Sequence, residues 1–147
     1  MKNRKILMNI IESIGDKYTF FVENYSEETD LCNRIVFIIS DDNLMELIFD
    51  DEKGIITSIV EFAPEDDILL EKHVVDDLLD EFKKEESPFD MLVMSDEHTG
   101  LDLVKLYNVD EFDAKHLIEL IEYIKKPNEF VKKLMTIKQY EEEDYVR

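Results

Sequence analysis

The 147-residue chain holds 37 Asp and Glu residues against 17 Lys and Arg residues, which gives it a formal charge of −20 at pH 7. A surface this negative repels nucleic-acid phosphates and anionic membranes, so neither is an expected partner and a basic protein is favoured. Hydrophobic residues make up 44% of the chain, enough for a core, so the acid excess does not indicate disorder. We expect one folded domain over residues 1–147.

Cysteine use and hydropathy indicate a cytoplasmic protein. Cys32 is the only cysteine in the sequence, so an internal disulfide is impossible and a reducing compartment fits best. Asn9, Glu12 and Ser13 interrupt the N-terminal apolar stretch, which argues against a signal peptide. The longest uninterrupted apolar run, Ile35–Ile39, is too short to cross a bilayer.

An amphipathic helix is expected first, because apolar residues near the N-terminus recur three and four positions apart. Gly15 follows at the position of a helix C-cap. The apolar residues of this helix are Ile6, Leu7, Ile10, Ile11 and Ile14.

Four strands are expected next, and the polar, acidic residues 24–33 are expected to form a loop between the first two. The turn-rich residues 50–54 predict a hairpin. Five consecutive apolar residues in the second strand predict burial on both of its faces. The strands are expected at Tyr18–Val22, Arg34–Ser40, Leu44–Phe49 and Ile55–Ala63.

Helices and strands alternate in the second half of the chain. Apolar residues recur at helical spacing from Asp66 to Glu86, where Asp66 or Asp67 would serve as the N-cap and Ser87-Pro88 would end the helix. The later elements are strands at Phe89–Met94 and Leu101–Tyr107, a helix that Asp110 and Asp113 open and Pro127 ends, and a last helix carrying Phe130 and Leu134.

The order helix, four strands, helix, two strands, helix, helix predicts an α+β fold. We expect a mainly antiparallel sheet of about five to six strands with the amphipathic helices packed on one face, because a sheet needs an apolar face covered. The acidic end at residues 141–147 is expected to fray.

Acidic residues gather on the polar side of the 66–86 helix and in two turns. A single charged helix is more often a solvated face than a binding site, but self-repulsion on this scale destabilises a fold unless binding or solubility compensates. We therefore expect this helix to contact a basic partner, supported by the turns at 50–54 and 95–102. The expected contact residues are Asp66, Asp67, Glu71, Asp76, Asp77, Asp80, Glu81, Asp50, Asp51, Asp96 and Glu97.

The sequence predicts neither an enzyme nor a metal or cofactor site. The segment SDEHTGLD at 95–102 holds oxygen ligands, but it lacks the alternation of a calcium loop, and a hairpin connection explains it better. His73 and His116 have no Ser or Cys beside them in sequence, although a triad assembled only in space stays open. The glycines are isolated, which argues against a phosphate-binding loop.

The pattern from about Gly15 to Leu134 resembles the class I type III secretion chaperones. The segments RIVFIIS, LMELIFDDEKG and IITSIVEFAPED are similar to that family's strand run before its central helix, and YNVDEFDAKHLIELIEYI is similar to the passage into its closing helix. The resemblance implies an acidic α+β protein that dimerises and holds a secreted effector. The acidic segment NYSEETDLCN and the helix end DEFKKEESP depart from the family pattern.

The composition also resembles that of immunity proteins, which neutralise bacterial toxins and share no common fold. Opposite charges raise association rates, and carboxylates can occupy a site that binds nucleic-acid phosphates. Because one fold hosts many functions, charge is weighted above element order. The sequence therefore predicts a non-catalytic immunity protein that masks a basic, nuclease-type toxin, with the secretion chaperone as the alternative and a DNA mimic behind both.

Overall fold

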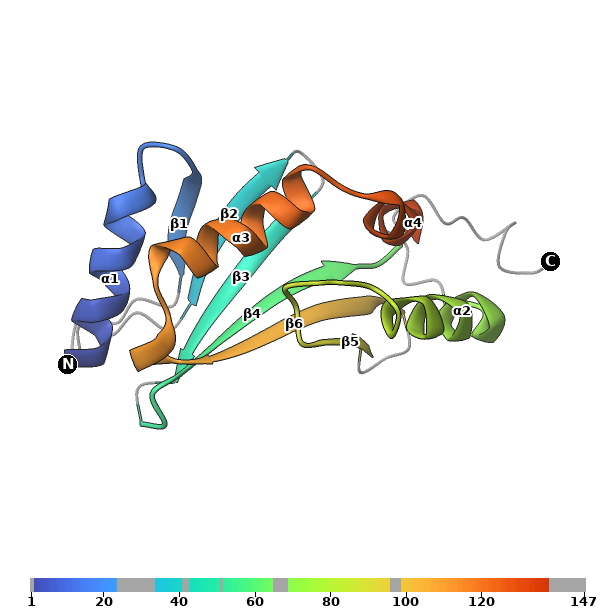
Figure 1. The fold of residues 1–147 in the computed structure, drawn as a ribbon, viewed down its shortest axis with the longest axis horizontal. Helices are drawn as coiled ribbons and strands as arrows, with labels where there is room; N and C mark the ends of the chain where they lie inside the picture. The colour runs from blue at the N-terminus through green and yellow to red at the C-terminus, as the bar shows by residue number, and fades with distance from the viewer. Residues whose placement is uncertain are drawn as a thin grey trace.

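The computed structural model describes residues 2–23, 34–40, 43–50, 52–64, 69–95 and 99–137, and its elements follow the predicted order (Figure 1). The six strands form one open antiparallel sheet with the order β1-β2-β3-β4-β6-β5. The predicted α+β fold is thus confirmed. The strands are β1 (Thr19–Glu23), β2 (Arg34–Ser40), β3 (Asn43–Asp50), β4 (Ile55–Phe62), β5 (Met91–Met94) and β6 (Leu101–Asn108).

Four α-helices and one short 3₁₀ helix accompany the sheet in the described residues. Two helix starts have side-chain caps: Asp113 Oδ1 accepts from the His116 N–H at 2.9 Å, and Asn128 Oδ1 accepts from the Val131 N–H at 2.9 Å. Pro127 lies between the last two helices, as predicted. The helices are α1 (Lys2–Ile14), α2 (Lys72–Phe82), η1 (Val109–Glu111), α3 (Ala114–Lys125) and α4 (Glu129–Thr136).

Glycine is needed at two positions next to paired strands. Gly54, between β3 and β4, has φ of 64°, a left-handed conformation that other residues rarely adopt. Gly100, just before β6, lies so close to β4 that an added Cβ would sit 2.7 Å from the Phe62 carbonyl oxygen. Both predicted hairpins are present, since β3 pairs with β4 and β5 pairs with β6.

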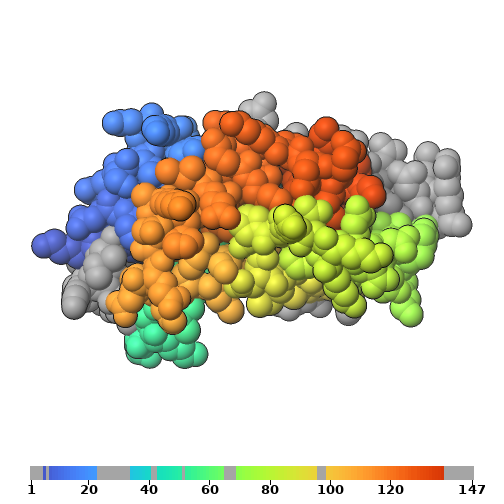
Figure 2. Space-filling view, viewed as in Figure 1, coloured from blue at the N-terminus to red at the C-terminus, as the bar shows by residue number. Residues whose placement is uncertain are grey.

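One face of the sheet carries the core. Along β3, alternate residues from Asn43 to Phe49 are buried, and along β4 alternate residues from Ile56 to Phe62 are buried. The register places Leu47 opposite Ser58, so these two buried sets share a face. In Figure 1, α3 crosses in front of β2 and β3, and α2 and α4 lie toward the other end of the sheet. Figure 2 shows this side covered by helix side chains, with only the β3–β4 turn of the central strands projecting at its lower edge.

The predicted helix at 66–86 is shorter than expected. Helix α2 begins at Lys72, and Leu70 is buried in the core from a non-helical position just before it. Helical spacing could not separate Leu70 from the helix, because an extended residue can reach the same core. The helix ends at Phe82, whose ring centre lies 5.9 Å from that of Phe130 on α4. The chain then turns. Asp66 and Asp67, the predicted caps, lie outside the described residues.

Two strand predictions also need correction. β2 is not buried on both faces throughout, because Ile38 is 41% exposed while Val36 and Phe37 are buried. The strand expected to start at Phe89 starts at Met91. Phe89 packs in the core from outside the sheet, with its ring centre 5.9 Å from that of Tyr123. Its apolar side chain therefore made the predicted strand begin too early.

Two leucines on opposite faces of β6 test this layering. Leu103 is fully buried and Leu106 is 46% exposed. We expect Leu103→Ala to lower the free energy of unfolding by about 2–5 kcal/mol, because it leaves a cavity under the helices. Leu106→Ala should lower it by less than about 1 kcal/mol. Urea unfolding followed by circular dichroism measures both, and equal losses would contradict a one-sided core.

Candidate partner-binding surfaces

The second face of the sheet carries exposed apolar side chains. The register places Phe21 opposite Val36, Val36 opposite Glu46, and so on across the sheet, so one row of this face crosses all six strands. Apart from Glu46 this row is apolar; Phe21 is exposed, Val36 is buried, and the other members are partly buried. Its members are Phe21, Val36, Glu46, Ile59, Val104 and Met91.

Most of the large exposed apolar residues within the described chain lie on this face. We call it the open face and define it by six of them, each at least 37% exposed: Phe21, Ile38, Leu44, Ile48, Val93 and Leu106. The described helices pack on the other side, so their side chains leave these residues uncovered. Single exposed apolar residues are ordinary, but six on one sheet face, beside a largely apolar row, indicate a candidate interaction surface.

An ion pair crosses the open face. The Arg34 guanidinium on β2 donates to Glu46 Oε1 on β3, and both side chains are about one-third exposed. The register puts Arg34 opposite Ile48 and Glu46 opposite Val36, so apolar side chains flank the pair. A guanidinium and a carboxylate that are already paired allow an apolar surface to contain charges without leaving either one unsatisfied.

The open face was missed in the sequence analysis because hydrophobic strand residues were assigned to the core by default. A signal was present, however. β3 reads Leu44, Glu46 and Ile48 at the positions between its buried residues, so apolar side chains occupy both faces of that strand. Only the placement of the helices decides which set is covered.

Three of the predicted acidic residues on α2 are exposed. Asp76, Asp77 and Asp80 all point away from the buried residues Val75 and Leu78. Spacings of one, three and four residues place them on one side of the helix. The predicted acidic stripe is therefore present over this part of α2.

Two other predicted α2 residues already have partners inside the molecule. Both carboxylate oxygens of Glu81 accept from Lys133 Nζ of α4 at 3.0 Å. The Glu71 side chain is only 16% exposed, and its Oε2 lies 3.1 Å from His73 Nδ1. Glu81 thus connects α2 to α4, whereas Glu71 contacts a side chain two residues away. Both carboxylates are less available to a partner than those of the three exposed aspartates.

The remaining predicted contact residues are only partly described. Asp50 ends β3, and its Oδ1 accepts from the Lys53 N–H at 3.1 Å, so it shapes the hairpin turn. Figure 1 places this turn and α2 at opposite ends of the sheet, so the structure does not bring Asp50 and the α2 acids together. Five further predicted contact residues lie outside the described part of the chain: Asp51, Asp66, Asp67, Asp96 and Glu97. A role in partner binding stays a prediction for every residue of the set.

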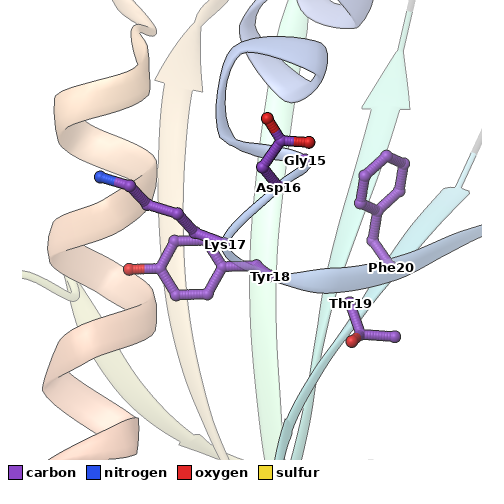
Figure 3. A pocket seen from close by; sticks show the side chains of 6 residues that line it. All are labelled: Gly15, Asp16, Lys17, Tyr18, Thr19 and Phe20. Carbon is purple, nitrogen blue, oxygen red and sulfur yellow. The ribbon is translucent and has the colours of Figure 1, made fainter.

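A cavity of about 290 Å³ lies at the turn between α1 and β1 and is lined by residues 15–20 (Figure 3). Tyr18 points from this turn toward α3, where Lys125 Nζ lies 5.5 Å from the centre of its ring. Burial, and then the charge of Glu122 and a hydrogen bond to it, raise the pKa of Tyr18. These contacts attach the α1–β1 turn to α3 and offer no reactive group.

Three further features concern metal ligands, membrane-spanning helices, and the histidine and cysteine side chains. No group of three or more His, Cys, Asp or Glu side chains among them is placed to hold a metal ion. None of the described helices has the length and apolar character needed to span a membrane. His116 Nδ1 lies 2.7 Å from Asp113 Oδ1, and Cys32 lies outside the described residues.

Comparison with known proteins gives structural neighbours only. No protein-family model matches the chain, and no curated protein matches it significantly. The type III secretion chaperone SycH of Yersinia pestis, solved in complex with a stable fragment of YscM2, matches with a TM-score of 0.57 at 12% identity, over 92% of this chain and 98% of SycH. A chain from the HopA1–SchA chaperone–effector complex matches with a TM-score of 0.54 at 9% identity, over 84% of this chain and 93% of that one. The fold resemblance to type III secretion chaperones is thus confirmed.

Charge reversal on α2 tests the predicted acidic contact surface. If a basic partner contacts α2, changing Asp76, Asp77 and Asp80 to Lys should slow its association about tenfold or more at low salt, because electrostatic steering is reversed. Folding should change little, since all three side chains are exposed. Stopped-flow or surface-plasmon measurements at low and high salt give the rates. The matched control reverses Glu12, Asp16 and Glu129, which are exposed elsewhere. Equal rates for the two triple variants would remove α2 from the interface.

Proposed function

We propose that this protein is a chaperone of the type III secretion kind, which binds a segment of a secreted protein on the open face of its sheet. The open face is the single observation that carries the proposal. A surface of this kind is unfavourable in a protein that acts alone, because its apolar side chains stay in contact with water. A bound protein segment would cover them.

The charge of the chain suits a chaperone that must stay dissolved while exposing such a surface. A net charge of −20 opposes self-association by repulsion between copies. It also favours a bound segment that carries basic residues beside its apolar ones. The apolar face would provide affinity, and the surrounding acids would provide solubility and steering.

The structural neighbours support the same function. SycH is described in complex with a fragment of YscM2, and the HopA1–SchA structure is a chaperone–effector complex. Both matches extend over most of this chain, so the likeness includes the sheet and its helices. These observations favour the secretion chaperone, which the sequence analysis ranked second, over the immunity protein that it ranked first. Dimerisation is part of this proposal, and light scattering of the purified protein tests it.

The immunity-protein hypothesis stays a prediction with a different surface requirement. A toxin inhibitor of the predicted type would use exposed carboxylates such as those of Asp76, Asp77 and Asp80. A chaperone of the proposed type would use the open face. Variants in the two surfaces therefore separate the two functions.

An aspartate placed in the open face should weaken partner binding. We expect Leu44→Asp and Ile48→Asp each to weaken capture of a secreted effector at least tenfold, because each buries an unpaired carboxylate under the bound segment. The measurement is co-purification from the native host, with mass spectrometry and limited proteolysis to map the protected segment. A protected segment in the N-terminal region of a type III secreted protein is the expected product.

Leu69→Asp is the matched control, because Leu69 and Leu44 are both 46% exposed and Leu69 lies in the segment before α2. Thermal unfolding confirms that all three variants remain folded. If Leu44→Asp and Leu69→Asp capture the partner equally well, the open face is not the binding surface. Capture of one toxin domain that depends on the α2 acids would favour the inhibitor instead.

A further inference from the structure

A second candidate site lies at the edge of the sheet, where the chain before β5 separates from β6. β5 pairs with β6 only over Leu101–Val104, whereas β4 pairs with β6 as far as Asn108. A cavity of about 520 Å³ occupies the resulting fork, lined on one side by Ser87 and Pro88 and on the other by residues 105–107. This volume falls in the usual range for ligand sites, about 300–1,000 Å³.

Asp90 ties the two sides of the fork together next to β5. Its N–H donates to the Val104 carbonyl at 2.9 Å, and its carboxylate accepts from the Leu106 N–H at 3.0 Å and from Lys105 Nζ at 2.7 Å. The charge of Lys105 is therefore compensated within the wall. Because the N–H and C=O of a strand residue point to the same side, the Leu106 carbonyl also faces the fork.

Aromatic rings form another wall of the cavity. Tyr107 is buried, with its ring centre 5.1 Å from that of Phe112 and 5.3 Å from that of His116. Lys105 Nζ lies 5.0 Å from the centre of the Tyr107 ring. The molecule thus already places one cation against this ring, as the negative face of an aromatic ring favours.

Two carboxylates complete the lining. Glu111 follows β6 in η1, and Glu119 lies on α3. Neither takes part in an ion pair with another described residue. Burial, followed by the negative charges of Glu119, Asp90 and Asp113, raises the pKa of Tyr107 to about 12. After burial, nearby carboxylates thus contribute to the shift at this wall of the cavity.

We propose that this fork cavity binds an arginine side chain of a partner protein. A guanidinium carries five N–H groups in a fixed planar fork, so it can donate to two carboxylates and a carbonyl. Glu111, Glu119 and the Leu106 carbonyl supply these acceptors within one cavity, and Tyr107 forms part of its wall. Lysine fits less well, because its ammonium is strongly hydrated and lacks this fork.

A protein is the expected source of this arginine. The net charge of −20 draws basic proteins toward the surface, and the cavity opens at a sheet edge that an extended segment can approach. Leu106 borders both the cavity and the open face, but Tyr107 and Glu119 in the lining lie off that face. A test with an arginine peptide uses no effector, so its outcome does not depend on the proposed function.

The probe is a blocked pentapeptide with a central arginine between alanines, compared with the same peptide carrying citrulline, which has a similar shape and no charge. Amide chemical shifts of the full-length protein measure affinity and location together. We expect the arginine peptide to bind at least fivefold more tightly at low salt and to shift Lys105, Leu106 and Glu119. Glu119→Gln and Glu111→Gln should each weaken it about fivefold or more, because a charge-assisted hydrogen bond is lost.

Glu129→Gln is the matched control, since it removes one exposed carboxylate on α4 and should leave the affinity unchanged. Equal binding of the arginine and citrulline peptides, shifts located elsewhere, or no shifts at millimolar peptide would overturn the proposal. Equally tight binding of free N-acetylarginine amide would overturn the assignment to a partner protein. A bound arginine should also lower the pKa of Tyr107, measured from tyrosinate absorbance.

Discussion

Burial of alternate strand residues against the helices is the interaction on which the rest of this structure depends. Each strand of the sheet presents one set of side chains to α1, α3 and their neighbours, and that face holds fully buried residues such as Ile56, Phe62 and Leu103. The side chains between them must point the other way, because strand residues alternate strictly. Covering one face therefore determines which apolar residues remain on the other.

The exposed apolar face and the negative charge are complementary features. Apolar residues on the open face would promote association between copies, and a net charge of −20 opposes it. Carboxylates that have internal partners, such as Glu81 with Lys133 and Asp90 with Lys105, contribute to holding elements together. The exposed ones on α2 remain available for solubility or contact. The same excess of acid thus serves the fold in some places and the surface in others.

Much of the fold could be predicted from local pattern. The order of elements, the hairpin at Gly54 and the break at Pro127 follow from residues whose conformational preferences act within a few positions. Errors occurred where tertiary contacts decide. Leu70 and Phe89 belong to the core from outside regular elements, and their apolar character extended the predicted helix and strand. Ile38 was predicted to be buried because it stands in a run of five consecutive apolar residues.

The candidate sites divide in the same way. Composition by itself determined that the protein is highly acidic, and helical spacing determined that Asp76, Asp77 and Asp80 share one side of α2, because both properties are local. Only the tertiary structure decided that Leu44 and Ile48 are exposed while Leu47 is buried, since that depends on where the helices pack. The fork cavity likewise brings Ser87, Tyr107 and Glu119 together from separate elements. Proximity of this kind arises from strand pairing and helix packing, which no stretch of sequence contains.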